Sequence, residues 1–504
     1  MKSITARDRW LAAILFVAAW IVYVRTLAPS ITWRNDAADS GDLVTAAFTL
    51  GVPHPTGYPL YTLIAAAFAR LPFGEPAQGV ALFSALAAAA AVVCVYFAAR
   101  AMMPADTRTE VSMLAAACAA LTLAFAPLFW AQATVAETYA LNALLVAALF
   151  AVLLSEHPRR LELAAGVFGL GLAHHLSIVL LAPSALWLLA GDKWSRAQIT
   201  RAIVFLLAPL LLYVYLPIRA SANPPVNWGD PSTLAGFWWT ISAAPYHSYF
   251  FGFPLQDLLG RVAMPARDLL QQFGIWGAAL GLWGVAQMFT SDAPRARRNV
   301  LALALAFALA VGYSVVYASR NSYVYLLPAF IVFALWLGYG IADLARYFSP
   351  ARARAGLIAA LILLPGFNLV ANFSALDLSQ DHTAIDYAAS AFRGIPNDAV
   401  IITDGDQRLF ALWYYRYVRA PDSRVVVVSR ELLQFDWYYE AMQRLMPALP
   451  DASVVPTYTL RLQEVVDQNR RAGRAVYSTI QGEGLVQWTM RSNGVLFQIT
   501  GRQE

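Results

Sequence analysis

Apolar stretches of nearly membrane-spanning length recur along the chain as far as about residue 372, separated by short polar or basic segments. About 20 apolar residues are needed for a helix that crosses a bilayer, and several of these stretches are slightly shorter. They lie near residues 10–27, 78–100, 111–128, 140–155, 162–173 with 176–190, 201–218, 272–290, 299–317, 323–345 and 355–372. This pattern predicts a polytopic α-helical membrane protein with about eleven transmembrane helices.

Two segments decide how these helices are oriented. If residues 58–73 form a juxtamembrane helix and residues 162–190 a hairpin turning at His174 and His175, the basic clusters fall on the cytoplasmic side. If residues 58–73 cross and residues 162–190 form one span, several arginines move outside. The first arrangement fits the charges better. It places these polar segments outside: 28–77, 129–139, 174–175, 219–271, 318–322 and 373–504.

The composition changes at residue 373, where long apolar runs stop and charged residues become frequent. We therefore divide the chain into a transmembrane domain, residues 1–372, and a soluble extracytoplasmic domain, residues 373–504. Alternating helix and strand patterns predict a small α/β fold for the second domain. The expected elements are helices at 386–394 and 407–418, and strands at 399–403, 424–429, 474–480 and 494–500.

The composition agrees with a membrane location. Hydrophobic residues make up 59% of the 504 residues and charged residues only 13%, about half the share in soluble domains. The net charge of +5 lies in short runs between apolar stretches, as in membrane loops, and no nucleic-acid-binding motif occurs. The two cysteines, Cys94 and Cys118, lie in apolar stretches without a zinc-binding pattern.

The first external loop, residues 28–77, is the most informative segment for chemistry. Asp36, Asp39 and Asp42 are spaced three residues apart, so a short helix would bring them to one face. Paired carboxylates beside a bilayer suit a general base or a metal site. The alternative is ordinary helix capping in a solvated loop. We expect Asp39 and Asp42 to be the catalytic candidates.

A rigid turn follows these carboxylates. The run from Gly51 to Pro59 contains three prolines and two glycines besides His54 and Tyr58. Such a turn would hold His54 and Tyr58 near the carboxylates. His54 could then donate a hydrogen bond to a phosphate, or it could make a structural hydrogen bond within the turn.

An arginine on the outer face runs against the positive-inside tendency and needs an explanation. Arg219 follows an apolar stretch, and its planar guanidinium would suit the phosphate of a donor molecule. Arg320 makes a similar, weaker case. The loop after Arg219, N-P-P-V-N-W-G-D-P at residues 223–231, supplies Asn227 and Trp228 as candidate substrate-binding residues.

Three further residues are candidate substrate ligands. Glu137 lies among apolar residues at the end of a span, where a carboxylate is costly unless it is used or paired. His174 and His175 interrupt an apolar stretch at the expected outer turn, although a buried hydrogen-bonded pair would explain them equally well. Asp404-Gly405-Asp406 follows an expected strand, where ligands can bind in open α/β sheets, but we favour an ordinary turn there.

Several of these motifs together resemble a known family. D-S-G-D at 39–42 and G-V-P-H-P-T-G-Y-P-L-Y at 51–61 carry the resemblance, and further segments extend it over most of the chain. These are A-E-T-Y-A-L-N at 136–142, Y-L-P-I-R-A at 215–220, N-P-P-V-N-W-G-D-P at 223–231, G-D-Q at 405–407 and L-W-Y-Y at 412–415. The family, formerly a domain of unknown function, includes the eukaryotic endoplasmic-reticulum protein O-mannosyltransferase that modifies plexins. It usually has Glu where this chain has Asp42.

The resemblance implies a GT-C-type glycosyltransferase that takes a sugar from a polyprenyl-phosphate donor. Asp39 matches the family's acidic catalytic position, and direct displacement would invert the sugar linkage. The expected acceptor is a protein Ser or Thr hydroxyl, or an envelope glycan or lipid. No cofactor or metal is predicted, although Asp42 and Glu137 would be candidate cation ligands.

The expected location is the inner (cytoplasmic) membrane, with the active site facing the periplasm. A membrane transporter or lipid flippase is the main alternative function, and a non-catalytic envelope scaffold is the third.

Overall fold

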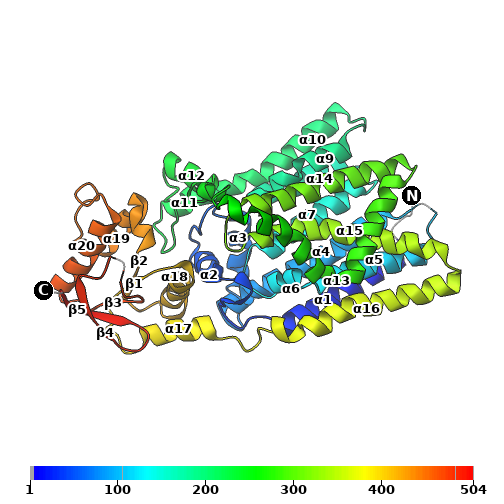
Figure 1. Ribbon diagram of the computed structural model, residues 1–504. Coiled ribbons are helices and arrows are strands. Elements are labelled where there is room, and N and C mark those ends of the chain that lie inside the picture. Colours follow the sequence, from blue (N-terminus) through cyan, green and yellow to red (C-terminus); the bar gives the residue numbers. More distant parts are fainter. Residues whose placement is uncertain (1–4, 105, 483, 503–504) are drawn as a thin grey trace.

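The computed structural model describes residues 5–104, 106–482 and 484–502. A long bundle of helices is followed by a compact domain with a β-sheet at one end of the bundle (Figure 1). The helices of the bundle and its loops are α1 (Ala6–Arg25), α2 (Ser40–Thr49), α3 (Pro59–Phe68), α4 (Pro76–Met102), α5 (Thr109–Ala124), α6 (Pro127–Ala133), α7 (Tyr139–Leu154), α8 (Arg160–Leu172), α9 (Ala182–Leu189), α10 (Arg196–Leu207), α11 (Tyr215–Ala220), α12 (Leu234–Ile241), α13 (Leu258–Thr290), α14 (Pro294–Val316), α15 (Leu327–Leu344) and α16 (Pro350–Leu376).

Helices α4 and α15 form the core of the bundle. Helix α4 begins with Pro76 in its first turn, where the missing N–H costs nothing, and its alanine-rich sequence has high helix propensity. Its small side chains allow close packing against α1, α5 and α7. Helix α15 is buried along its whole length from Leu327 to Asp343, so it lies inside the bundle rather than against lipid.

Within the described residues, six helices are long and apolar enough to cross a membrane, or seven if α5 and α6 are one bent span. The six are Pro76–Met102, Arg196–Ala220, Leu255–Thr290, Pro294–Val316, Ser322–Tyr347 and Pro350–Leu376. The total of about eleven spans therefore stays a prediction. Helix α3 has ten residues and a length of about 15 Å, too short to cross a bilayer. This length agrees with a juxtamembrane position for residues 58–73.

The domain beyond α16 has a five-stranded mixed sheet with strand order β2-β1-β3-β5-β4. Strand β1 pairs in parallel with β2 and β3, while β5 pairs antiparallel with β3 and β4. The elements of the domain are α17 (Thr383–Phe392), β1 (Val400–Thr403), α18 (Asp406–Tyr414), β2 (Val426–Ser429), α19 (Asp436–Leu445), α20 (Tyr458–Arg471), β3 (Val476–Ser478), β4 (Trp488–Ser492) and β5 (Phe497–Arg502).

Most of the expected secondary structure in this region is present, but helices α19 and α20 were missed, and so was strand β4. Its sequence, W-T-M-R-S, is largely exposed beyond Trp488, as suits an edge strand. Such a strand carries little of the apolar signal that marks β1 and β2, all of whose residues are buried. The hairpin of β4 and β5 therefore depends on pairing with β3, which a local pattern does not reveal.

The sheet domain docks directly on the first external loop. Helix α18 packs against α2, and the contact is so close that a Cβ atom at Gly41 would lie 2.3 Å from the carbonyl oxygen of Phe410. Only glycine fits there without moving the backbone of one helix. A second link joins the loop to residues 226–228: Val52 donates its N–H to the Val226 carbonyl (2.8 Å) and accepts from Trp228 (3.1 Å). These contacts build the site from three distant parts of the chain.

Candidate active site

Asp42 is fully buried and has all of its hydrogen bonds inside the protein. Its Oδ2 accepts from the backbone N–H of His54 (3.0 Å) and from His54 Nδ1 (2.7 Å), and its Oδ1 accepts from Trp228 Nε1 (3.0 Å). It does not belong to the lining of the nearby cavity. The Asp42 carboxylate therefore holds the turn at His54 and the indole of Trp228 in place. This position suits a positioning residue, whereas its spacing in the sequence had suggested a catalytic one.

The partners of His54 suit an imidazolium, with a proton on both ring nitrogens. Nδ1 donates to Asp42, and Nε2 lies 3.3 Å from the Tyr58 hydroxyl and 3.9 Å from Asp39 Oδ2. The Tyr58 hydroxyl donates its own hydrogen to the Pro55 carbonyl (3.1 Å), so it accepts from Nε2. Burial lowers the pKa of His54, but the charges of Asp39 and Asp42 outweigh it and raise that pKa to about 9.

Asp39 is the carboxylate that faces the open space. It precedes the first residue of α2, its side chain makes no capping hydrogen bond, and that side chain is 30% exposed. Burial raises the pKa of Asp39, the His54 charge lowers it, and Asp42 raises it again. Asp39 is thus a carboxylate with raised proton affinity beside an imidazolium, as suits a group that accepts a proton during a reaction.

A cavity of about 1040 Å³ opens over Asp39 and His54. Its wall is rich in aromatic side chains, which present apolar faces with polar edges. They come from the first loop, the middle of the chain and the sheet domain: Trp33, Tyr58, Tyr139, Trp228, Tyr246, Tyr249, Phe250, Tyr313, Tyr317, Tyr325 and Phe410. Such a wall is suited to a ligand with both apolar and hydroxylated parts.

The loop after β1 closes one side of this cavity, at the position where an ordinary turn was favoured over ligand binding. Residues 404–408 line the wall, and the Gln407 carbonyl accepts a hydrogen bond from Trp33 Nε1 (3.0 Å). Desolvation in the cavity, with the nearby charges of Asp39 and Glu431, raises the pKa of Asp406 to about 7. The available signal was the position of this loop at the carboxyl end of a parallel strand, where ligands commonly bind.

Arg320 is exposed and lines the cavity, as expected for a donor-binding cation. Its charge lowers the pKa of Asp36, which burial raises. Arg408 is a second exposed cation in the wall, and it was missed with the rest of its loop. Both guanidinium groups are placed to meet an anionic ligand.

Arg219 does not line the cavity, so the expectation that it holds a donor phosphate finds no support in its position. Its Nε donates to the Leu50 carbonyl (2.6 Å) and its Nη2 to that of Thr49 (3.4 Å), at the C-terminal end of α2. Arg70 binds the preceding carbonyls of Ala47 and Phe48. Arg219 therefore stabilises the negative C-terminal end of α2, where it binds the last two carbonyls beyond those that the backbone cap at Leu50 and Gly51 satisfies.

Tyr58, His175 and Trp228 line the cavity, while Glu137, His174 and Asn227 lie outside its wall. Glu137 is buried, and desolvation together with Asp39 raises its pKa well above the ordinary value. His174 is buried below the wall, where its Nε2 donates to the Thr138 carbonyl (2.9 Å). Burial lowers the pKa of His174 to about 3, so its ring is neutral.

Asn227 serves the loop in which it lies. Its Nδ2 donates to the Ala220 carbonyl (3.4 Å) and to Asp230 Oδ1 (3.3 Å).

As for metal binding, the described ranges contain no group of three or more His, Cys, Asp or Glu side chains that could hold an ion.

The fold is that of GT-C enzymes. The crystal structure of ArnT from Cupriavidus metallidurans bound to undecaprenyl phosphate matches with a TM-score of 0.54 at 13% identity, covering 84% of this chain and 90% of that one. The Archaeoglobus fulgidus oligosaccharyltransferase matches with a TM-score of 0.51 at 14% identity, covering 92% of this chain and 68% of that one. At these identities the likeness concerns the fold.

Sequence comparison finds similar proteins. Residues 39–198 match the protein O-mannosyl-transferase TMEM260 N-terminal domain, and residues 384–483 match the TMEM260-associated domain 2. The mouse protein O-mannosyl-transferase TMEM260 is 28% identical over 91% of this chain and 69% of its own length. The Dictyostelium discoideum relative is 21% identical over 84% of this chain and 58% of its own length. The chain is therefore similar to TMEM260 proteins over both segments, and it is a GT-C-type membrane glycosyltransferase.

Proposed function

We propose that this protein transfers a sugar from a polyprenyl-phosphate donor to an acceptor hydroxyl at the outer face of the membrane, with Asp39 as the base. The observation that carries the proposal is the Asp39 carboxylate, which faces a large cavity beside the His54 imidazolium. Two curated relatives are named protein O-mannosyl-transferases, which favours mannose as the sugar and a protein hydroxyl as the acceptor. The ArnT structure with undecaprenyl phosphate favours a polyprenyl donor.

The proposed step is a direct displacement. Asp39 takes the proton of the acceptor hydroxyl as its oxygen bonds to the anomeric carbon of the sugar. The bond between that carbon and the donor phosphate oxygen breaks, and its electron pair leaves with the polyprenyl phosphate. Attack from the face opposite the phosphate inverts the linkage.

The charged residues around the cavity have separate roles in this displacement step. The His54 proton keeps Asp39 in its ionised form, because the imidazolium lies 3.9 Å from its Oδ2. Arg320 takes over the role first considered for Arg219: it faces the cavity and would stabilise the negative charge that grows on the leaving phosphate. His54 has protein partners for both ring nitrogens, so we assign it to Asp39 rather than to the phosphate.

The proposed orientation follows from the distribution of basic residues. Arg159, Arg160, Lys193, Arg295 and Arg298 lie at helix ends far from the cavity. The positive-inside rule places that end in the cytoplasm. We therefore propose an inner-membrane enzyme with its cavity and sheet domain on the periplasmic side.

The test is sugar transfer by the purified protein in lipid, from radiolabelled polyprenyl-phosphate mannose to a protein acceptor extract. Asp39→Asn should reduce the rate by about 100-fold or more, because general-base catalysis contributes that much. Asp36→Asn is the matched control, since it makes the same change in the same cavity wall, and it should lose far less.

Two outcomes would contradict the proposal, and each contradicts a different part of it. Undiminished transfer by folded Asp39→Asn protein would remove Asp39 from the base role. Movement of the donor lipid between leaflets with no sugar transfer by the wild type would favour a flippase.

A further inference from the structure

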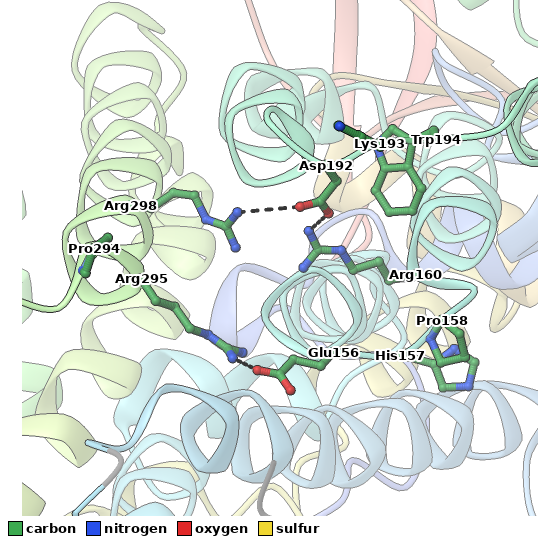
Figure 2. Close-up of a pocket in the computed structure, with 10 residues that line it drawn as sticks. All are labelled: Glu156, His157, Pro158, Arg160, Asp192, Lys193, Trp194, Pro294, Arg295 and Arg298. Carbon is green, nitrogen blue, oxygen red and sulfur yellow. Dashed lines mark hydrogen bonds and ion pairs between the residues drawn. The ribbon is translucent and has the colours of Figure 1, made fainter.

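A second cavity, of about 620 Å³, lies where three connections between helices meet, and we name it the basic pocket. Figure 2 shows its lining: the α7–α8 connection and the start of α8, the α9–α10 connection, and the first turn of α14. The ten residues are Glu156, His157, Pro158, Arg160, Asp192, Lys193, Trp194, Pro294, Arg295 and Arg298. None of them takes part in the proposed transfer reaction.

The basic pocket and the active-site cavity lie at opposite ends of the same helices. Helix α14 contributes Arg295 and Arg298 to the basic pocket near its start, while Tyr313 near its end lines the cavity. Arg298 and the cavity-lining Tyr317 are 19 positions apart, or about 30 Å along a helix, which matches the hydrocarbon thickness of a bilayer. The basic pocket therefore faces the membrane surface opposite the cavity.

The charges in this pocket do not balance. Arg160, Lys193, Arg295 and Arg298 stand against two carboxylates. Figure 2 shows that Asp192 pairs with Arg160 and Glu156 with Arg295, while Arg298 Nη1 only approaches Asp192, at 3.9 Å.

Two cationic groups are therefore left over. The Nε of Arg298 is buried without a hydrogen-bond acceptor in the part of the chain that the structure describes. Lys193 is exposed at the rim of the pocket. A buried N–H donor without an acceptor is costly, so the pocket is built to receive one.

The surroundings indicate what kind of acceptor fits. An arginine fork and a lysine together suit phosphate oxygens. Trp194 adds an aromatic face, over which the Arg160 guanidinium lies 5.7 Å from the ring centroid. Basic pockets between transmembrane helices on the cytoplasmic side bind acidic lipid headgroups. We propose that the basic pocket binds the phosphate of an anionic phospholipid in the leaflet opposite the active site.

The experiment uses the full chain reconstituted in phosphatidylcholine with or without phosphatidylglycerol, with thermal unfolding and native mass spectrometry as readouts. Phosphatidylglycerol should raise the unfolding midpoint and remain bound to the wild type. The variants are Arg298→Gln and Lys193→Gln, alone and combined. We expect affinity to fall about tenfold or more in the double variant, because hydrogen bonds from charged groups are lost.

Arg297→Gln is the matched control, because Arg297 is exposed on the same turn of α14 and does not line the pocket. It removes the same charge and should keep the lipid effect. The single variant Lys193→Gln separates loss of lipid binding from misfolding, because Lys193 is exposed at the rim of the basic pocket. An equal loss in the control, or no difference between the two lipids, would overturn the proposal. A stabilising effect of inorganic phosphate without any effect of phosphatidylglycerol would identify a free phosphate and overturn the lipid assignment.

Discussion

The active-site cavity and the basic pocket share helices but use charge in opposite ways. Four carboxylates line the cavity, at Asp36, Asp39, Asp404 and Asp406, against the arginines 320 and 408. The basic pocket has twice as many cations as carboxylates. The surplus of cations in the basic pocket suits an anionic ligand, whereas the surplus of carboxylates in the cavity suits the acceptance of a proton.

The contrast extends to how the carboxylates are held. In the basic pocket both carboxylates pair directly with arginine, which neutralises them. Among the described residues, the ion-pair partner of Asp39 in the cavity is a histidine, His54, at 3.9 Å, and no arginine, whereas the buried Asp42 accepts hydrogen bonds from His54. Separating the positioning carboxylate from the reactive one keeps Asp39 available for a proton.

The substitution Asp42→Asn should have the largest effect on this separation of roles between Asp42 and Asp39. The amide cannot neutralise the His54 charge, so the turn and the imidazolium lose their anchor. We expect kcat to fall by about 100-fold, with an alkaline limit of activity at lower pH, because Asp42 helps to raise the pKa of His54. Transfer rates measured against pH check this. A normal rate with an unshifted alkaline limit would show that Asp42 does not act through His54.

A second test separates the role of Arg320 from that of Arg219. Arg320→Gln should raise the donor KM by about tenfold, because a charged contact to phosphate is lost. Arg219→Gln should instead lower the unfolding temperature and leave KM near the wild-type value, since its partners are the Thr49 and Leu50 carbonyls. If the two variants behave in the reverse way, their assignments must be exchanged.

The smallest expected effect concerns Asp406. Its charge contributes to raising the pKa of His54 to about 9, so Asp406→Asn should move the alkaline limit of activity down by a fraction of a pH unit. It should also remove a titration near pH 7, where Asp406 itself ionises. A pH profile of kcat, compared with that of Asp386→Asn on α17, measures both changes. Identical profiles in wild type and Asp406→Asn would leave this loop with a purely structural role.

The sequence allowed the heart of the site to be predicted because its parts are close in the chain. Asp39, Asp42 and the proline-rich turn all lie between residues 39 and 59, so a rigid turn had to bring His54 and Tyr58 near the two carboxylates. The structure confirms that proximity with direct hydrogen bonds between Asp42 and His54. Which carboxylate is buried depends on Trp228, whose position is a matter of tertiary folding.

The features that escaped prediction all depend on distant contacts. Arg219 meets carbonyls about 170 positions earlier in the chain, so its outward position could not be assigned to helix capping from local sequence. The loop at 404–408 enters the cavity only because α18 docks on α2. The basic pocket gathers three connections, each of which alone is an ordinary positively charged membrane loop.

The close contact at Gly41 has a consequence for the timing of assembly. Residues 404–410 are synthesised more than 350 positions after Gly41, yet they complete the cavity wall. A ribosome that has finished the membrane helices has therefore produced a site open on one side. Asp39 meets a complete cavity wall only after the last domain has settled on Gly41. Docking of that domain on α2 is thus the last step in the assembly of the cavity.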